Sequence, residues 1–171
     1  MKVLVTYLSQ SGNTEIIAKA IHEEAAVNNK VVHKKLEEIT PKEVAGYDFI
    51  FIGSPLHSGS ITAPVKECLG ALQETTGQKM AGFITHFAPA YPEQDMDGFA
   101  EPLKEACKAK GIEYKGCFDC QGYLADAMHA PVQKMMNLTD EAWAGMVAQM
   151  TGRPNDEDVA NAKAYARAVL A

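Results

Sequence analysis

Short runs rich in Val, Ile and Phe alternate along this chain with longer segments whose apolar residues recur three or four positions apart. Runs of the first kind are typical of buried β-strands, and segments of the second kind are typical of amphipathic helices. Because strands that alternate with helices pair in parallel through right-handed crossovers, we predict an α/β fold with helices on both faces of a doubly wound sheet. The predicted strands are Val3–Leu8, Val31–Leu36, Asp48–Ile52, Met80–Ile84 and Ile112–Phe118.

Four segments carry a helical stripe, and a fifth, Pro41–Tyr47, is too short for a full crossover helix. The four predicted helices are Thr14–Ala25, Thr62–Leu72, Phe99–Cys107 and Asn155–Leu170. The last helix has an Asn cap and acidic residues in its first turn, as a stable helix N-terminus requires. A chain of 171 residues suits one domain, so we predict a single domain over residues 1–171.

A stretch from residue 121 to residue 152 lies between the fifth predicted strand and the final helix, and a five-stranded fold does not need it. We predict a helical insertion there, with helices near Asp126–Met136 and Thr139–Met150. Its methionines favour packing between these helices, although an exposed methionine surface can also adapt to a partner. They are Met128, Met135, Met136, Met146 and Met150.

Composition excludes several classes of function. The formal net charge of -6 argues against nucleic acid, which needs a clustered basic face, but leaves basic protein partners open. No apolar run approaches the roughly 20 residues of a membrane span, and the first residues do not resemble a signal peptide, so we expect a cytoplasmic protein without membrane insertion.

The four cysteines do not form a disulfide scaffold, and we expect reduced thiols. Cys117 and Cys120 have the C-x-x-C spacing, but they lie at the end of a strand rather than at a helix N-terminus that would lower a thiol pKa. His57, His86 and His129 have no metal-ligand spacing with carboxylates, so we predict no metal site.

The segment Ser9–Thr14 carries the sharpest chemical signal, because it joins a buried strand to an amphipathic helix. A helix N-terminus offers unpaired backbone N–H groups and a positive dipole end, which bind phosphate without a cationic side chain. The loop lacks the Gly-Lys-Ser/Thr ending of a P-loop and the three glycines of a dinucleotide fingerprint, so a monophosphate fits best. A polar turn whose Ser and Thr only cap the helix is the alternative.

The stretch Thr6–Thr14 resembles the FMN-phosphate loop that opens flavodoxins. Phe49–Gly59 resembles the third strand of that family with the first of its two isoalloxazine loops, and His86–Tyr91 is placed like the second. Gly152–Asn155 and the closing helix are similar to those of some flavodoxin-like proteins. The resemblance implies the strand order 2-1-3-4-5, in which these loops converge at the carboxyl edge beside the switch point.

The resemblance implies noncovalent FMN as the cofactor and residues in three loops as its contacts. For the phosphate they are Ser9, Gln10, Ser11, Gly12, Asn13 and Thr14, and for the ring system Ser54, Pro55, Leu56, His57, Ser58, Gly59, His86, Phe87, Ala88 and Tyr91. No tryptophan stacks on the ring from the first ring loop. Phe87 and Tyr91 either cover the other face or belong to the core and the surface, and Gly59 is the candidate for a peptide that contacts flavin N5.

Neither ring loop contains Lys or Arg, and Glu93 and Asp95 follow the second, so an anionic hydroquinone would lack a cationic partner. We therefore expect a low-potential electron carrier between redox proteins, with no catalytic side chain of its own. The rival is a small FMN-dependent NAD(P)H oxidoreductase, in which the insertion roofs a pocket and His57 and His129 supply protons. A flavodoxin-shaped module without FMN is a third hypothesis.

Overall fold

A computed structural model describes residues 1–88 and 93–171. Its central sheet has the order β2-β1-β3-β5-β6, with every neighbouring pair parallel. The strands are β1 (Lys2–Tyr7), β2 (Lys30–Lys35), β3 (Phe49–His57), β5 (Lys79–His86) and β6 (Glu113–Gln121). Since β4 (Ser60–Ile61) pairs only with β3, this order is the predicted 2-1-3-4-5, and the flavodoxin-like α/β fold is confirmed.

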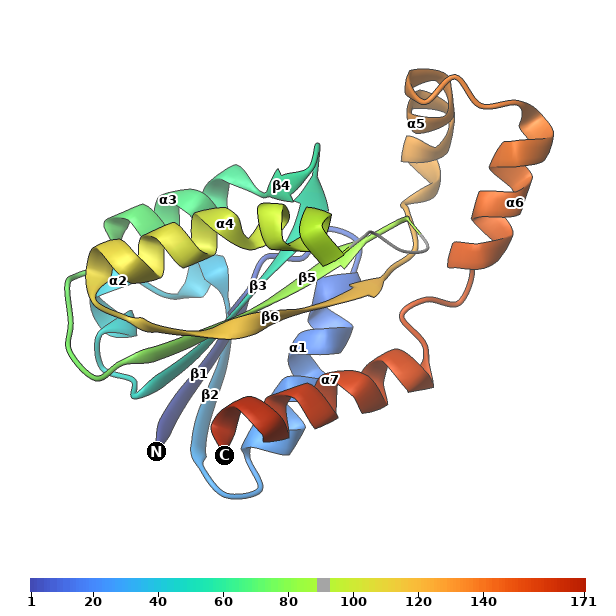
Figure 1. The fold of residues 1–171 in the computed structure, drawn as a ribbon. Coiled ribbons are helices and arrows are strands. Elements are labelled where there is room, and N and C mark those ends of the chain that lie inside the picture. The colour runs from blue at the N-terminus through green and yellow to red at the C-terminus, as the bar shows by residue number, and fades with distance from the viewer. Residues whose placement is uncertain (89–92) are drawn as a thin grey trace.

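Helices cover both faces of the sheet (Figure 1). One face carries α1 (Asn13–Ala25) and α7 (Asp156–Leu170), and the other carries α2 (Pro41–Val44), α3 (Ala63–Ala71) and α4 (Glu93–Lys110). A 3-10 turn, η1 (Leu36–Glu38), follows β2. Alternate residues of one strand enter opposite cores, as the pleat requires: Val3 and Val5 pack under α1 and α7, whereas Leu4 packs on the other side.

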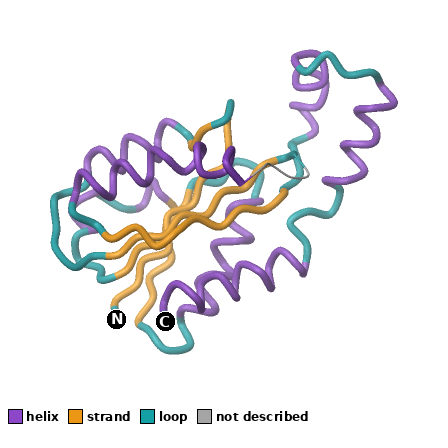
Figure 2. The backbone as a smooth tube through the Cα atoms, in the orientation of Figure 1, coloured by secondary structure: helices purple, strands orange, loops and turns teal. Residues whose placement is uncertain are grey.

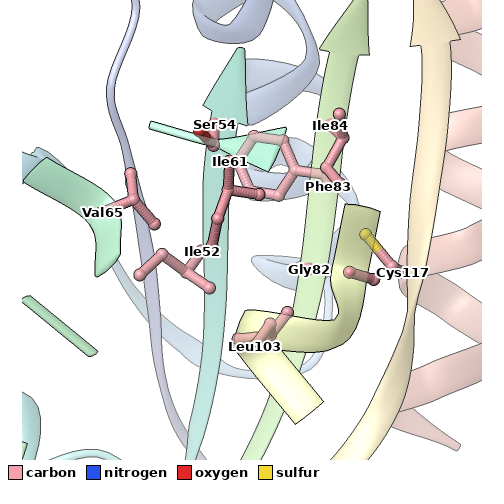
Figure 3. Close-up of a pocket in the computed structure, with 10 residues that line it drawn as sticks. Ile52, Ser54, Ile61, Val65, Gly82, Phe83, Ile84, Leu103 and Cys117 are labelled. Carbon is pink, nitrogen blue, oxygen red and sulfur yellow. The ribbon is translucent and has the colours of Figure 1, made fainter. Parts of the chain in front are cut away.

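The second core contains a small cavity of about 10 Å³, which has room for about one water molecule. Figure 3 shows it between β3, β5 and α4, with Ile52, Leu103 and Cys117 among its walls. It is a packing defect of the core and is far too small for an organic ligand. None of the helices in the described part of the chain has the length and apolar character to cross a membrane.

The third strand is longer than predicted, and the pairing of the last two strands is irregular. The third strand runs five residues beyond Ile52, because Leu56 pairs with Ile61 and His57 with Ser60 in a β-hairpin. The register of β5 and β6 shifts between Met80 and Gly82, where the bulge in β6 holds Gly116 at φ +108°.

The predicted helical insertion forms three short elements, η2 (Asp126–Met128), α5 (His129–Met135) and α6 (Asp140–Met150). We call residues 122–152 the helical excursion, because Figure 1 shows α5 and α6 projecting from the carboxyl edge of the sheet. Its own core has only three buried side chains, Val132, Trp143 and Met150. Met150 is fully buried, as predicted, but Met128, Met135 and Met136 are 47%, 75% and 41% exposed, so packing was the wrong interpretation for those three.

Candidate phosphate-binding site at the carboxyl edge of the sheet

The loops after β1, β3 and β5 lie at one edge of the sheet, because these neighbouring strands are parallel (Figure 2). The chain leaves β1 for β2 on one side and returns to β3 on the other, so the switch point falls between β1 and β3. This is the position at which open α/β sheets bind ligands. The start of the first loop is tied to β3 by a hydrogen bond of 3.0 Å from the Leu8 N–H to the Gly53 carbonyl.

The loop between β1 and α1 leaves a row of backbone donors free. Gly12 is the N-cap of α1 in the left-handed region, with φ +91°, and no side chain caps the helix there. Within residues 1–88 and 93–171, the backbone N–H groups of residues 10–14 have no acceptor, and the first paired one is that of Glu15, 3.3 Å from Ser9 Oγ. Consecutive free N–H groups at the start of a helix, here one of 13 residues, can bind an anion. We call these groups the phosphate cradle.

The side chains of this loop have different partners. Ser9 Oγ and Ser11 Oγ accept hydrogen bonds, so each hydroxyl hydrogen is still available to a ligand, and Gln10 is exposed. Thr14 is only 1% exposed, and its hydroxyl lies 2.8 Å from that of Thr85 in β5. Thr14 therefore holds α1 against the sheet in this structure, a role that the loop sequence does not reveal.

Asn13 is also committed within the protein. Its side-chain Nδ2 donates to Ser11 Oγ at 3.1 Å and to the Tyr123 carbonyl at 2.8 Å. The second bond reaches the first residues of the helical excursion, 110 positions along the chain. Sequence reasoning missed this partner, because nothing local to Asn13 or Tyr123 marks a contact between them.

The predicted first ring loop includes the turn of a β-hairpin between β3 and β4. Ser58 and Gly59 have φ of +50° and +74°, which makes a two-residue type I′ turn. A Ser-Gly pair between the apolar Leu56 and Ile61 is the sequence signal for such a turn. His57, Ser58 and Gly59 are exposed at its tip, and Pro55 and Leu56 are half-buried.

Ser54 differs from the rest of that set, because its side chain is directed into the core. It is 2% exposed and lines the small cavity shown in Figure 3. Its Oγ accepts from the Thr62 N–H at 3.0 Å and donates to the Pro55 carbonyl at 2.8 Å. Ser54 thereby fixes the start of α3, and its hydroxyl is not presented at the edge.

The second ring loop is anchored to the end of β6. His86 Nδ1 lies 2.9 Å from the Ala88 carbonyl, and His86 Nε2 lies 3.0 Å from Asp119 Oδ2. Gln121 Nε2 donates to the Phe87 carbonyl at 2.8 Å. Phe87 packs against the small core of the helical excursion, so the structure favours core packing over ring stacking for it. Tyr91 lies outside the described residues.

His129, Cys117 and Cys120, which the sequence offered as candidates for proton transfer or redox chemistry, have structural roles. His129 Nε2 is 2.9 Å from the Leu124 carbonyl, and its ring meets that of Trp143 edge-on. Cys117 and Cys120 belong to the cores on opposite faces of the sheet. Burial raises the pKa of both thiols, so neither has the thiolate character of a redox cysteine. Among the described residues, no three His, Cys, Asp or Glu side chains are grouped as metal ligands.

Three comparisons with known proteins agree with this geometry. An uncharacterized protein of Methanocaldococcus jannaschii is 27% identical over 171 residues, 99% of each chain. The flavodoxin-like domain-containing protein BilS of Clostridioides difficile is 29% identical over 144 residues, 82% of this chain and 77% of BilS. The crystal structure of oxidised flavodoxin 2 from Bacillus cereus superposes with a TM-score of 0.68 at 22% identity, over 99% of this chain and 98% of that one. The sequence model of the flavodoxin domain matches residues 4–167, and the chain therefore belongs to the flavodoxin domain family.

Proposed function

We propose that this chain binds one FMN noncovalently at the carboxyl edge of its sheet and carries single electrons at low potential between redox proteins of the cytoplasm. The observation that carries the proposal is the phosphate cradle, whose N–H groups at residues 10–14 have no acceptor among the described residues. In a member of the flavodoxin family, this cradle fits the phosphate of a flavin mononucleotide.

The residues present fit that group. The cradle N–H groups and the hydroxyl hydrogens of Ser9 and Ser11 would hold the phosphate, and no cationic side chain is required. The hairpin tip His57–Gly59 and the segment His86–Ala88 would border the ring system, with Tyr91 as a further candidate. FMN, when bound, supplies one- and two-electron redox chemistry, and the protein supplies binding, orientation and the surrounding charge.

The charge at this edge supports a low potential. Residues 54–60 and 86–91 contain no Lys or Arg, and Asp95 in the first turn of α4 is exposed. A negative charge added to the ring system on reduction would therefore meet carboxylates and no Lys or Arg in these loops. This arrangement disfavours the anionic reduced form and lowers the potential of the semiquinone/hydroquinone couple.

The surroundings of His57 and His129, the two proton donors that the NAD(P)H oxidoreductase hypothesis requires, favour the carrier hypothesis. His129 is half-buried, bonded to the Leu124 carbonyl and packed on Trp143, so it supports the excursion and is not presented to a substrate. His57 is exposed at the hairpin tip without a neighbour that would position it as an acid among the described residues. A carrier needs no such group, and its net charge of -6 would steer it to redox proteins with a basic face.

Anaerobic photoreduction of the FMN-reconstituted protein, followed by visible absorbance, tests the proposal. We expect a blue neutral semiquinone, no turnover when NADH or NADPH is added, and a semiquinone/hydroquinone potential below that of free FMN. Direct bleaching by a nicotinamide without a radical would establish the oxidoreductase instead. A potential above that of free FMN would contradict the charge argument, and failure to retain FMN would contradict the site.

A further inference from the structure

The side-chain amide of Asn13 connects the phosphate cradle to the helical excursion. Its Nδ2 donates to Ser11 Oγ at 3.1 Å within the loop and to the Tyr123 carbonyl at 2.8 Å where the excursion begins. The orientation of the amide is determined by Tyr123, because a backbone carbonyl accepts hydrogen bonds and cannot face the amide oxygen. Both N–H bonds of the Asn13 side-chain amide are thereby used inside the protein.

The contact is close enough to require glycine at the adjacent position. A Cβ on Gly122 would lie 2.6 Å from Asn13 Cγ and 2.6 Å from Asn13 Nδ2, which is shorter than real Cβ contacts. The Gly122 N–H also donates to the His86 carbonyl at 2.7 Å, and the Tyr123 N–H donates to the Arg153 carbonyl at 3.1 Å. The beginning of the excursion is thus attached to the cradle, to the second ring loop and to the residue just beyond its own end.

The hydroxyl of Ser11 can link the Asn13 amide to an anion in a chain of hydrogen bonds. Ser11 Oγ accepts from Asn13, so the Ser11 hydroxyl hydrogen can point only to another acceptor, and the cradle beside it is the place for an anion. Hydrogen bonds in such a chain polarise and strengthen one another. An anion held by Ser11 would therefore strengthen the bond from Asn13 Nδ2 to Ser11 Oγ and so fix the amide in the orientation that also donates to Tyr123, although the Asn13 side chain does not itself reach the anion.

We propose that Asn13 is a positioning residue that couples occupation of the phosphate cradle to the placement of the helical excursion. That Asn13 holds the start of the excursion in place is argued from the structure alone. That a ligand in the cradle strengthens this attachment rests on the proposed function. Coupling between two equilibria is reciprocal, so the excursion in its observed place also favours binding at the cradle. Because Met128, Met135 and Met136 are exposed on the excursion, loading of the cradle would fix the surface that carries them.

Hydrogen exchange of the apo protein tests the first half. In Asn13→Ala, we expect the amides of residues 123–136 to exchange about three to ten times faster, the loss equivalent to one hydrogen bond. Asn29→Ala is the matched control, because Asn29 Nδ2 makes the same kind of bond, 3.0 Å to the Ala25 carbonyl, at the other end of α1. Far-UV circular dichroism establishes that both variants fold. Unchanged exchange at residues 123–136 in Asn13→Ala would overturn the proposal whether or not FMN binds.

FMN and riboflavin, which differ in the phosphate, test the second half. We expect FMN, and not riboflavin, to slow exchange at residues 123–136 of the wild-type protein, and we expect Asn13→Ala to abolish that slowing. Gly122→Ala should weaken FMN binding about three- to tenfold and leave riboflavin binding unchanged, because it disturbs Asn13 without removing a cradle donor. Equal slowing by FMN in Asn13→Ala would overturn the coupling. Absence of FMN binding to the wild type would overturn the proposed function, and the apo exchange alone would then decide the role of Asn13.

Discussion

The sheet and the helical excursion bury side chains of the same kind on very different scales. Met80 in β5 and Met150 in α6 are both fully buried, yet among the residues that the structure describes Met80 lies in a core of fifteen buried side chains and Met150 in a core of three. The side chains of the larger core pack against many buried neighbours and lose those contacts together. We therefore expect the sheet to unfold as one unit and the excursion to open at a lower free energy. In the proposed coupling, the rigid sheet would hold the cradle in place while the excursion responds to it.

Met80→Ala should produce the largest loss of stability. Removing a fully buried Met side chain leaves a cavity in the larger core, which costs about 2–5 kcal/mol in the free energy of unfolding. Urea denaturation followed by far-UV circular dichroism measures it. A cost near zero would mean that the sheet core is as adaptable as the excursion.

Arg153→Ala should produce the next largest loss of stability. Arg153 directly follows the excursion, and its substitution removes the ion pair with Asp158 in the first turn of α7. Arg153 holds Asp158, which is 4% exposed, through two hydrogen bonds of 2.6 and 2.5 Å. Removing one partner of a fully buried pair costs about 3–5 kcal/mol, and we expect about 2–3 kcal/mol because the Arg153 side chain is 30% exposed and the Asn155 N–H still bonds Asp158.

The matched control is Arg167→Ala, which breaks a similar two-bond pair with Glu24 on an Arg side chain that is 67% exposed. It should cost no more than about 1 kcal/mol. Equal losses from both variants in the same urea experiment would show that burial does not distinguish the two pairs.

Met150→Ala should have a smaller effect on global stability than Met80→Ala, below about 1 kcal/mol, because it destabilises the excursion alone. Trp143, which is the single Trp of the chain, lies in the same small core and reports this local opening. In Met150→Ala, the Trp143 fluorescence transition should move to lower urea while the circular dichroism transition hardly moves. Coincident transitions, shifted equally, would show that excursion and sheet form one cooperative unit.

The smallest predicted effect is a pH dependence of the free energy of unfolding, caused by His33 in the edge strand β2, far from the excursion. The His33 ring is stacked between those of Tyr7 and His22, with centroids 5.1 and 5.2 Å away. Burial, and then the nearby charge of His22, lowers the pKa of His33. Glu15 and Glu38 act in the opposite direction, and Lys19 adds to the lowering.

With a lowered folded pKa, the unfolded chain binds protons first as the pH falls. His33 therefore contributes its full stability above about pH 6.5, and this contribution declines as the pH falls from there toward the folded pKa. His33→Phe keeps an aromatic ring in the stack and removes the titration. Urea midpoints at about pH 7.5 and about pH 5.5 should differ more in the wild type than in His33→Phe. Equal differences would contradict the assignment to His33.

Local sequence patterns predicted most strands of the sheet and the helices that cover it. A run such as Phe49–Ile52 is apolar because both faces of the strand are buried, so its position follows from sequence alone. The cap of α7 was equally readable, since Asn155 Oδ1 accepts from the N–H groups of Glu157 and Asp158.

The site was predicted less completely, because its connections are long-range. The bond from Asn13 to Tyr123 joins residues 110 positions apart, and that from Thr14 to Thr85 joins residues 71 positions apart. Neither side chain belongs to a periodic pattern. The hairpin at Ser58 and Gly59 was different, since its turn residues are present in the sequence, yet the predicted strand ended at Ile52.

The claim that this chain holds a flavin phosphate in the cradle is tested most directly by titrating the apo protein with FMN and with riboflavin, using quenching of flavin fluorescence, in the wild type and in Ser11→Asp. Ser58→Asp, at the exposed hairpin tip, places the same charge beside the proposed ring site but outside the cradle, so it should change FMN and riboflavin affinity alike. An unpaired carboxylate against a phosphate costs several kcal/mol, so FMN affinity should fall by about 100-fold or more in Ser11→Asp and riboflavin affinity should not. Unchanged FMN affinity in Ser11→Asp would contradict the account and place the phosphate elsewhere.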